Sequence, residues 1–545
     1  MSSPGQGPLQ LYLRETDAAL RAQDTERALR LAEEATSRGL EHPNLLTLAG
    51  HRRMQAGDAA NALVLLTRAR ALAPRSADVL NALGICLSQL GRAREALPVF
   101  DAALRSAPGT AMLRFNKALA YEKLGELDHA RRELEGVVTL MPQHFEALAW
   151  LATLAAQRND SRSARDYAAK ALALNPRLHA ATLALATVDI AERDFANATA
   201  RLTPLLGDPE LSLVNRAFAQ SLVGDALDGE DRCADAFAAY AVSKAMLRDF
   251  YAPSFASPDF EAAAQRVNRL AAYFRNADPA LWRAQAGDPP AGPRVHAFLV
   301  GFPRSGTTLL EQVLASHPSI EAMEERDALI DAVTGYIVPK DGLDRLAHIA
   351  PDEIARLRRS YWRIAGEFGH SSGTDVFLDK MPLNTVLLPL IAKLFPDAKI
   401  VFALRDPRDV LLSCFRRRFG MTTQMFELTS LSGIAAYYDG VMGLAALYRD
   451  TLGLNVIETR HEDLLGDFEG ETRRLCGFLG VEWRAEMANF ALRAQTSTID
   501  TPSGAQVARG LTRAGADQWR RYAAKLAPAL PTLAPWVARF GYPES

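Results

Sequence analysis

The sequence predicts two architectures in series: an all-α superhelix in the N-terminal half and an α/β domain with a parallel sheet in the C-terminal half. Small residues recur at a fixed step through the first 245 positions, and strand-like apolar runs alternate with loops and helical segments after position 295. A fixed period of about 20 to 50 residues is typical of helical repeat arrays. Strands that alternate with helices are typical of a parallel sheet covered by helices.

The repeat has a period of 34 residues and is carried by four series of positions. Small residues are expected where two helices cross closely, a turn-forming residue where the first helix ends, and a proline after the second helix stops. The alanines are Ala28, Ala62, Ala96, Ala130, Ala164 and Ala198, and the other small residues are Gly50, Gly84, Ala118, Ala152 and Ala186. The turn formers are Gly57, Gly91, Gly125, Asn159 and Arg193, and the prolines are Pro74, Pro108, Pro142 and Pro176.

This pattern resembles the tetratricopeptide repeat family. The resemblance covers about residues 10–245, with six clear repeats and a seventh, weaker one around Gly229 and Ala236. Each repeat contacts only its neighbours, and two roles stay open: a rigid helical spacer, or a concave face that binds a protein or peptide acceptor. We expect residues 1–9 to be disordered and residues 246–294 to form a helical extension and a linker rich in proline and glycine.

The composition excludes several classes of protein. The 545 residues include 62 basic and 64 acidic side chains, so the net charge is −2 and no nucleic-acid partner is expected. The four cysteines lie far apart with no C-x-x-C pair, which predicts neither a disulfide framework nor a zinc site. No apolar run approaches the roughly 20 residues of a membrane span, and residues 1–7 lack a signal-peptide pattern. We therefore expect a soluble, cytoplasmic protein with no transmembrane segment.

A phosphate-binding loop is predicted at the start of the C-terminal domain, for which we expect residues 295–545. The strand-like V-H-A-F-L-V runs into G-F-P-R-S-G-T-T and then into the helical L-L-E-Q-V-L-A-S-H-P. In this P-loop-like context, backbone N–H groups and the helix dipole hold an anion. The lysine that follows the second glycine of a Walker A loop is missing, which argues against a nucleoside triphosphatase or nucleotide kinase. The expected anion-binding residues are Arg304, Ser305, Gly306, Thr307 and Thr308.

A second segment indicates which anion is bound. The strand-like A-K-I-V-F-A-L runs into R-D-P-R-D-V-L-L-S, which places Arg405 at a strand end and Ser413 within the following helix. The loop and this pair resemble the sulfotransferase family, whose donor is 3′-phosphoadenosine 5′-phosphosulfate (PAPS) and whose nucleotide product is adenosine 3′,5′-bisphosphate (PAP). The resemblance implies that the loop binds the 5′-phosphosulfate, that Arg405 and Ser413 bind the 3′-phosphate, and that no metal is required. For Asp406, Arg408 and Asp409, a solvated charged turn is the simpler interpretation.

Further matches follow within the resemblance, which covers about residues 295–540. Lys380 of D-K-M-P matches the lysine that faces the bridging oxygen and the sulfuryl group in protein-tyrosine sulfotransferases. Arg509 and Gly510 resemble the family's basic-glycine element, which closes over the nucleotide phosphates. A surface salt bridge is the alternative role for Lys380 and for Arg509. Where many relatives carry a tyrosine that contacts the donor, this chain has His461, which is able to stack or to donate a hydrogen bond.

The segment E-A-M-E-E-R-D supplies a candidate base. Glu324 matches, position for position, the glutamate that is proposed as base in these relatives. The alternative is that Glu321, Glu324 and Glu325 open a helix, where the dipole favours acidic residues. Under the resemblance, Glu324 removes a proton from the acceptor hydroxyl, while Arg304 and Lys380 stabilise the charge on the leaving phosphate.

The resemblance implies a sulfotransferase that moves a sulfuryl group from PAPS to a hydroxyl acceptor. By analogy with tyrosine sulfation, the acceptor is a protein or peptide recruited by the repeat array. The acceptor and the oligomeric state stay open, because the same fold serves carbohydrates, lipids and small molecules. The alternative is a scaffold whose repeats bind partners and whose C-terminal domain is an inactive nucleotide-binding domain. We expect strands near residues 295–300, 374–379, 398–404 and 455–459, with the donor at their carboxyl ends.

Overall fold

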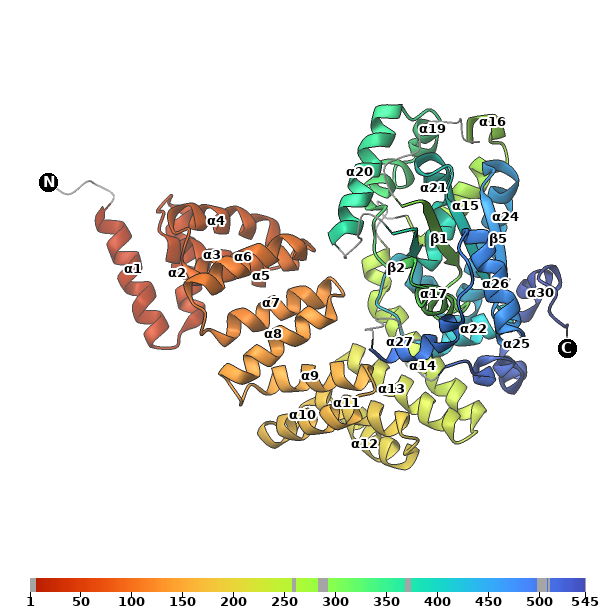
Figure 1. Ribbon diagram of the computed structural model, residues 1–545. Helices are drawn as coiled ribbons and strands as arrows, with labels where there is room; N and C mark the ends of the chain where they lie inside the picture. Colours follow the sequence, from red (N-terminus) through yellow and green to blue (C-terminus); the bar gives the residue numbers. More distant parts are fainter. Residues whose placement is uncertain are drawn as a thin grey trace. The chain divides into compact units, whose positions relative to one another are not determined.

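Helix pairs build the first part of the protein. The computed structural model describes residues 6–256, 261–282, 293–367, 374–496, 507 and 510–544. The chain divides into two compact units, Met1–Val188 and Asp189–Ser545. The helices of the first unit (Figure 1) are α1 (Gln6–Arg21), α2 (Thr25–Ser37), α3 (Pro43–Gln55), α4 (Ala59–Leu72), α5 (Ala77–Gln89), α6 (Ala93–Ser106), α7 (Ala111–Lys123), α8 (Leu127–Leu140), α9 (Phe145–Gln157), α10 (Ser161–Leu174) and α11 (His179–Ala191), which runs on into the second unit.

The helices of the first unit begin at a constant interval. The first helices of successive pairs begin at residues 43, 77, 111, 145 and 179, and the second helices begin at residues 25, 59, 93, 127 and 161. Both series step by 34 residues, so the predicted repeat is confirmed as a repeat of helix pairs.

The turns inside these pairs use the predicted residues. Gly57, Gly91 and Gly125 have φ values of 78°, 75° and 69°, and Asn159 has a φ of 57°. These angles lie in the left-handed region, which glycine adopts without a steric penalty and asparagine tolerates better than most residues. The chain therefore reverses direction at these positions.

A small residue is required where the two helices of a pair cross. A Cβ atom on Gly50 would lie 2.8 Å from Leu66 Cγ, and one on Gly84 would lie 2.6 Å from the Phe100 ring. In both pairs the bulky side chain comes 16 residues after the glycine. The volume at the crossing is therefore set by two positions, one on each helix.

The second unit begins with a further helix pair of the same kind. After α12 (Phe195–Gly207) come α13 (Leu213–Gly229) and α14 (Cys233–Phe255). α13 has 17 residues where α11 has 13. A Cβ atom on Gly224 would lie 2.5 Å from Tyr240, again 16 residues further along the chain. The seventh, weaker repeat is therefore present, and its crossing point has moved by one helical turn.

Five parallel strands form the centre of the second unit. The order across the sheet is β2-β3-β1-β4-β5, so the switch point of the sheet lies between β1 and β4. The four strands predicted from the sequence correspond to β1, β3, β4 and β5, whereas β2 was not predicted. The strands are β1 (Val295–Gly301), β2 (Ile320–Glu324), β3 (Val376–Lys380), β4 (Lys399–Leu404) and β5 (Asn455–Arg460).

Helices cover both faces of this sheet, which confirms the predicted α/β class (Figure 1). Phe298 and Val300 of β1 belong to the core of one face, and Ala297 and Leu299 belong to the core of the other. The first core is completed by α20 (Pro351–Glu367), α21 (Leu388–Leu394), α22 (Pro407–Arg416) and α24 (Leu431–Leu452). The second is completed by α17 (Thr307–Ala315), α26 (Phe468–Leu479) and α27 (Phe490–Thr496).

Shorter elements complete the described part of the second unit. Among the described residues, no helix combines the length and the apolar composition needed to cross a membrane. The further helices are α15 (Ala263–Phe274), α16 (Pro279–Trp282), α18 (Ile330–Ala332), α19 (Gly342–Ala347), α23 (Thr423–Glu427), α25 (His461–Gly466), α29 (Ala523–Leu526) and α30 (Leu530–Arg539), with short 3₁₀ turns at Arg513–Gly515 and Gln518–Tyr522.

We expect Gly84→Ala to destabilise the first unit by about 1 to 3 kcal/mol, the usual cost of overpacking a core. The added methyl group would collide with the buried ring of Phe100. Gly109→Ala is the matched control, because no atom lies within 4 Å of its Cβ position and its backbone is not left-handed. Urea denaturation followed by circular dichroism measures both variants, and equal midpoints would contradict the close crossing.

Candidate active site

The predicted phosphate loop, residues 302–306, joins the carboxyl end of β1 to α17. A Cβ atom on Gly301 would lie 2.6 Å from the carbonyl oxygen of Ala403 in β4. Glycine is therefore required where β1 passes β4, and the loop leaves the sheet at its switch point. Thr307 and Thr308 are buried and form the first turn of α17, where the helix dipole favours an anion.

Two residues of the loop have left-handed backbones. The φ of Arg304 is 73° and the φ of Gly306 is 88°. For a side chain as large as arginine this conformation is uncommon and costs free energy. The N–H of Ser305 donates to Phe302 O at 3.1 Å, which closes the turn. This N–H is therefore engaged within the loop, and the anion-binding role of Ser305 stays a prediction.

His461 begins α25, directly after β5, and packs against the loop. A Cβ atom on Gly306 would lie 2.8 Å from His461 Nδ1. Burial, and then the positive charge of Arg405, lower the pKa of His461 to about 3. The imidazole is therefore neutral at neutral pH, and it has one nitrogen that donates and one that accepts a hydrogen bond.

Three predicted donor-binding residues meet at the ends of β1 and β4. Arg304 Nε donates to Ser413 Oγ at 2.9 Å. Arg405 donates from one guanidinium nitrogen to Arg304 O at 3.2 Å and from another to Gly515 O. Ser413 lies in α22, the helix that follows β4. The structure thus brings the loop that carries Arg304 next to Arg405 and Ser413, which lie about 100 residues later in the sequence.

The charge around Arg304 is predominantly positive. Burial, followed by the positive charges of Arg417 and Arg405, lowers the pKa of Arg304 to about 9. The negative charge of Glu325 acts in the opposite direction but does not outweigh them. An anion bound among these side chains would reverse the balance and favour the charged guanidinium.

Lys380 at the carboxyl end of β3 is surrounded by carboxyl groups. Its side chain is fully buried, so the alternative of a surface salt bridge is wrong. Nζ lies 2.8 Å from Glu325 Oε1, 3.2 Å from Glu311 Oε2 and 3.5 Å from Glu324 Oε1. Burial by itself would lower the pKa of Lys380, but these three carboxyl groups raise it above its usual value. The ammonium group therefore stays charged in the interior.

The glutamates of E-A-M-E-E-R-D do not open a helix, so that alternative is wrong. Glu321 and Glu324 lie on β2, and Glu324 stands opposite Lys380 in the β2–β3 register. Glu325 follows the strand with a left-handed φ of 42°, and its N–H donates to Lys380 O at 2.8 Å. Both Glu324 and Glu325 are thus held beside the same lysine, by the strand and by the turn that ends it.

Comparison with known proteins agrees with this geometry. Residues 297–485 match the model of the sulfotransferase family, and residues 53–120 and 115–179 match tetratricopeptide repeat models. The chain joins tetratricopeptide repeats to a sulfotransferase domain.

Three relatives illustrate the similarity. Protein-tyrosine sulfotransferase A of Caenorhabditis elegans is 24% identical over 191 residues, which are 34% of this chain and 50% of that protein. Protein-tyrosine sulfotransferase 1 of Danio rerio is 23% identical over 259 residues, covering 45% of this chain and 71% of that protein. The omega-hydroxy-beta-dihydromenaquinone-9 sulfotransferase Stf3 of Mycobacterium tuberculosis is 28% identical over 142 residues, 25% of this chain and 36% of that protein. The chain thus spans half the length of the first relative and about a third of the last.

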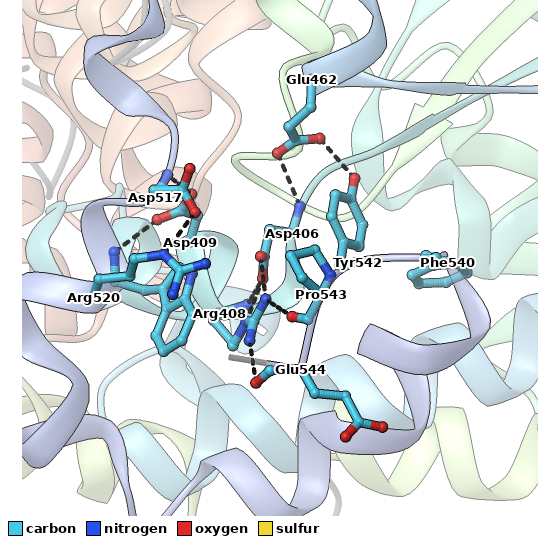
Figure 2. Close-up of polar contacts among 12 residues, drawn as sticks. Asp406, Arg408, Asp409, Glu462, Asp517, Arg520, Phe540, Tyr542, Pro543 and Glu544 are labelled. Carbon is cyan, nitrogen blue, oxygen red and sulfur yellow. Dashed lines mark hydrogen bonds and ion pairs between the residues drawn. The ribbon is translucent and has the colours of Figure 1, made fainter.

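The charged turn after β4 is buried in the sulfotransferase domain, so the interpretation as a solvated turn is wrong. Arg408 pairs with Asp406 at 2.7 Å and donates to Pro543 O at 2.7 Å and Glu544 O at 3.1 Å (Figure 2). Asp406 also caps α22 by accepting the N–H of Arg408 at 2.9 Å. A buried charged pair is tolerated when further hydrogen bonds satisfy it, and here the partners come from a distant part of the chain.

Two more carboxylates fasten the same region of the sulfotransferase domain. Asp409 accepts the N–H groups of Asp517 at 2.7 Å and Trp519 at 2.9 Å. Glu462 accepts the N–H of Asp406 at 3.2 Å and the hydroxyl of Tyr542 at 2.7 Å (Figure 2). The N-terminal end of α22 is therefore held by segments that the sequence places more than 100 residues later.

The basic-glycine element falls partly outside the described residues. Arg509 lies outside them, so its role stays a prediction. Gly510 has a left-handed φ of 85°, and its Cβ position is 3.8 Å from Ala491 of α27. Within the described residues after Gly510, Gly515 contacts the donor site, because its carbonyl oxygen accepts a hydrogen bond from Arg405.

Sequence reasoning missed Glu311 as a member of the site. It lies within α17, it is 2% exposed, and its carboxyl group approaches Lys380. The signal was a single charged residue in the mostly apolar run L-L-E-Q-V-L, because an acidic side chain in a buried helix usually has a charged partner. Burial raises the pKa of Glu311 well above the usual range of a glutamate.

We expect the effect of Glu311→Gln on stability to depend on pH. The folded protein keeps the Glu311 proton at pH values where the unfolded chain has lost it, so the wild type loses stability as pH rises through this range. Glutamine copies the neutral carboxyl group and removes that loss. The variant should therefore gain stability relative to the wild type between about pH 5 and about pH 8.

Urea denaturation at several pH values tests this expectation. Glu486→Gln is the control, because Glu486 is exposed. A free-energy difference between Glu311→Gln and the wild type that stays constant with pH would contradict a raised pKa for Glu311.

Proposed function

We propose that the protein is a PAPS-dependent sulfotransferase that uses a hydroxyl acceptor. The observation that carries the proposal is the contact of Arg304, Ser413 and Arg405 beside the first turn of α17. A loop and helix N-terminus suit one phosphate group, and a separate arginine–serine pair suits another. Nucleotides such as ADP and ATP lack the 3′-phosphate that would use the second position.

The donor-binding residues fit an anionic group. Arg405 Nε is buried and has no hydrogen-bond partner among the described residues, and an unsatisfied buried donor is costly. A phosphate oxygen next to Ser413 would satisfy it and offset the like charges of Arg304 and Arg405. The loop residues 304–308 would hold the 5′-phosphosulfate, with His461 packed behind Gly306. Gly510 and Arg509 would complete the enclosure of the phosphates.

The catalytic residues that we propose are Arg304, Lys380 and Glu324. When bound, PAPS supplies an activated sulfuryl group. Arg304 and Lys380 are fixed, charged donors, and preorganised charges of this kind stabilise negative charge that develops on a leaving group. Glu324 accepts the proton of the acceptor hydroxyl, and Lys380 holds its carboxylate in place. Glu325, which makes the shorter contact with Lys380, is the rival candidate for the base.

The acceptor that we propose is a tyrosine of a protein or peptide bound by the repeat array. Two of the relatives are named as protein-tyrosine sulfotransferases, and one is named for a hydroxylated menaquinone. A hydroxyl is the common feature of these acceptors. A phenol has a pKa of about 10, so its transfer reaction needs a base at neutral pH. The two glutamates beside Lys380 are the candidates for this base.

Calorimetry with PAP, ADP and ATP tests the donor class. We expect PAP to bind in preference to the other two nucleotides, and Arg405→Ala to weaken PAP binding by about 10- to 100-fold, because a charge-assisted hydrogen bond is lost. Arg484→Ala, at an exposed position, is the matched control. Equal binding of PAP and ATP by the wild type would contradict the donor assignment. PAP binding without transfer to any acceptor would instead favour the inactive scaffold.

Paired variants test the base. With an acceptor found in a screen that begins with tyrosine peptides, Glu324→Gln should lower turnover by about 100- to 10,000-fold, the usual contribution of a general base. Its affinity for PAP should stay nearly unchanged. Glu325→Gln is the comparison, and a larger loss there would assign the base to Glu325. A loss of PAP affinity that parallels the loss of turnover in Glu324→Gln would contradict the base role.

A further inference from the structure

The last helix pair, α13–α14, packs against the C-terminal end of α22 and lies in the same compact unit as the sheet (Figure 1). We propose that this pair supports the donor site from outside, and that Lys244 of α14 is a positioning residue for Ser413, the residue that Arg304 contacts. The inference rests on the proposed function, because it takes Ser413 and Arg304 as donor-binding residues.

Lys244 closes the C-terminal end of α22. Its Nζ donates to Cys414 O at 3.1 Å and to Arg417 O at 2.7 Å, and the residue is 6% exposed. The last carbonyl groups of a helix have no partner within the helix, and a cation is favoured there by the dipole. Burial lowers the pKa of Lys244 to about 8, so the ammonium group is largely charged at neutral pH. The lysine therefore supplies both the donors and the charge that this helix end requires.

Other side chains of the pair hold the same turn. Asp228 near the end of α13 pairs with Arg416 and accepts a hydrogen bond from Tyr522 OH at 2.6 Å. Phe237 of α14 stacks on Phe415, with 4.9 Å between ring centroids. The last turn of α22 is thus fixed by a lysine, an ion pair and an aromatic stack, all from the same two helices.

This turn also contacts the phosphate loop. Ser413 accepts from Arg304 Nε at 2.9 Å, and Cys414 Sγ donates to Pro303 O at 3.5 Å. A shift of the turn would lengthen both contacts and move Ser413 away from the 3′-phosphate position. A misplacement of about 1 Å is enough to cost about 100-fold in a reaction that depends on orientation. Lys244 therefore acts on the donor through α22, without touching it.

Nucleotide binding by the full-length chain tests the inference. Lys244→Met removes the donors but keeps an apolar side chain of similar length. We expect it to weaken PAP binding about tenfold or more, while adenosine 5′-phosphate, which lacks the 3′-phosphate, is affected little. The preference for PAP should therefore fall, which a purely structural defect would not cause. Lys244→Arg, which keeps a buried cation with several donors, should restore part of the preference.

Lys399→Met is the matched control. Lys399 Nζ donates to Phe478 O at 2.6 Å near the end of α26, which covers the other face of the sheet from α22. The inference would be overturned if Lys244→Met kept the wild-type preference for PAP over adenosine 5′-phosphate, or if the affinities for both nucleotides fell equally. If Lys244→Met does not fold, Lys244→Gln replaces it with the same criteria. A wild type that does not prefer PAP to ADP and ATP overturns the proposed function instead.

Discussion

Like charges have to be held together at the carboxyl ends of β1 and β4, and much of the second unit is arranged to do this. Arg304 and Arg405 come from neighbouring strand ends, and Arg405 donates to the carbonyl oxygen of Arg304, whose side chain in turn donates to Ser413. α22, which carries Ser413, has only 10 residues, and a helix of that length is not stable by itself. Its N-terminal end is held by the segments at 517–519 and 542–544, and its C-terminal end by α13–α14.

The carboxyl ends of the strands provide two different charge environments. At β1 and β4 positive charge is in excess, whereas at β2 and β3 Lys380 is surrounded by three carboxyl groups. A base beside several arginines would lose much of its affinity for a proton. Separate environments therefore suit the proposed reaction, in which one partner is an anion and the other gives up a proton.

Local sequence patterns were sufficient to predict the repeats, the strand–loop–helix segment at β1 and α17, and four of the strands. Helix crossings require a small residue at each period, and β1 and β4 are apolar because both of their faces are buried. β2 escaped prediction because I-E-A-M-E lies at the edge of the sheet and carries two glutamates among its five residues. The burial of Glu311 and Arg408 depends on partners that are distant along the chain, Lys380 and Pro543, and no local pattern contains that information. The role of Arg509 rests on the sequence alone.

At Arg304, with its left-handed backbone, the stability of the fold and ligand binding at the site favour different residues. Glycine at this position would adopt the same φ without strain and would remove one of the crowded positive charges. The fold would gain by that exchange, while the hydrogen bond to Ser413 would be lost. Strain of this kind persists where the surrounding structure holds it in place, and it is concentrated at functional sites. Under selection for thermal stability alone, Arg304 would be among the first residues to be replaced. A library of variants screened only for stability would therefore be enriched in well-folded proteins that no longer bind their ligand.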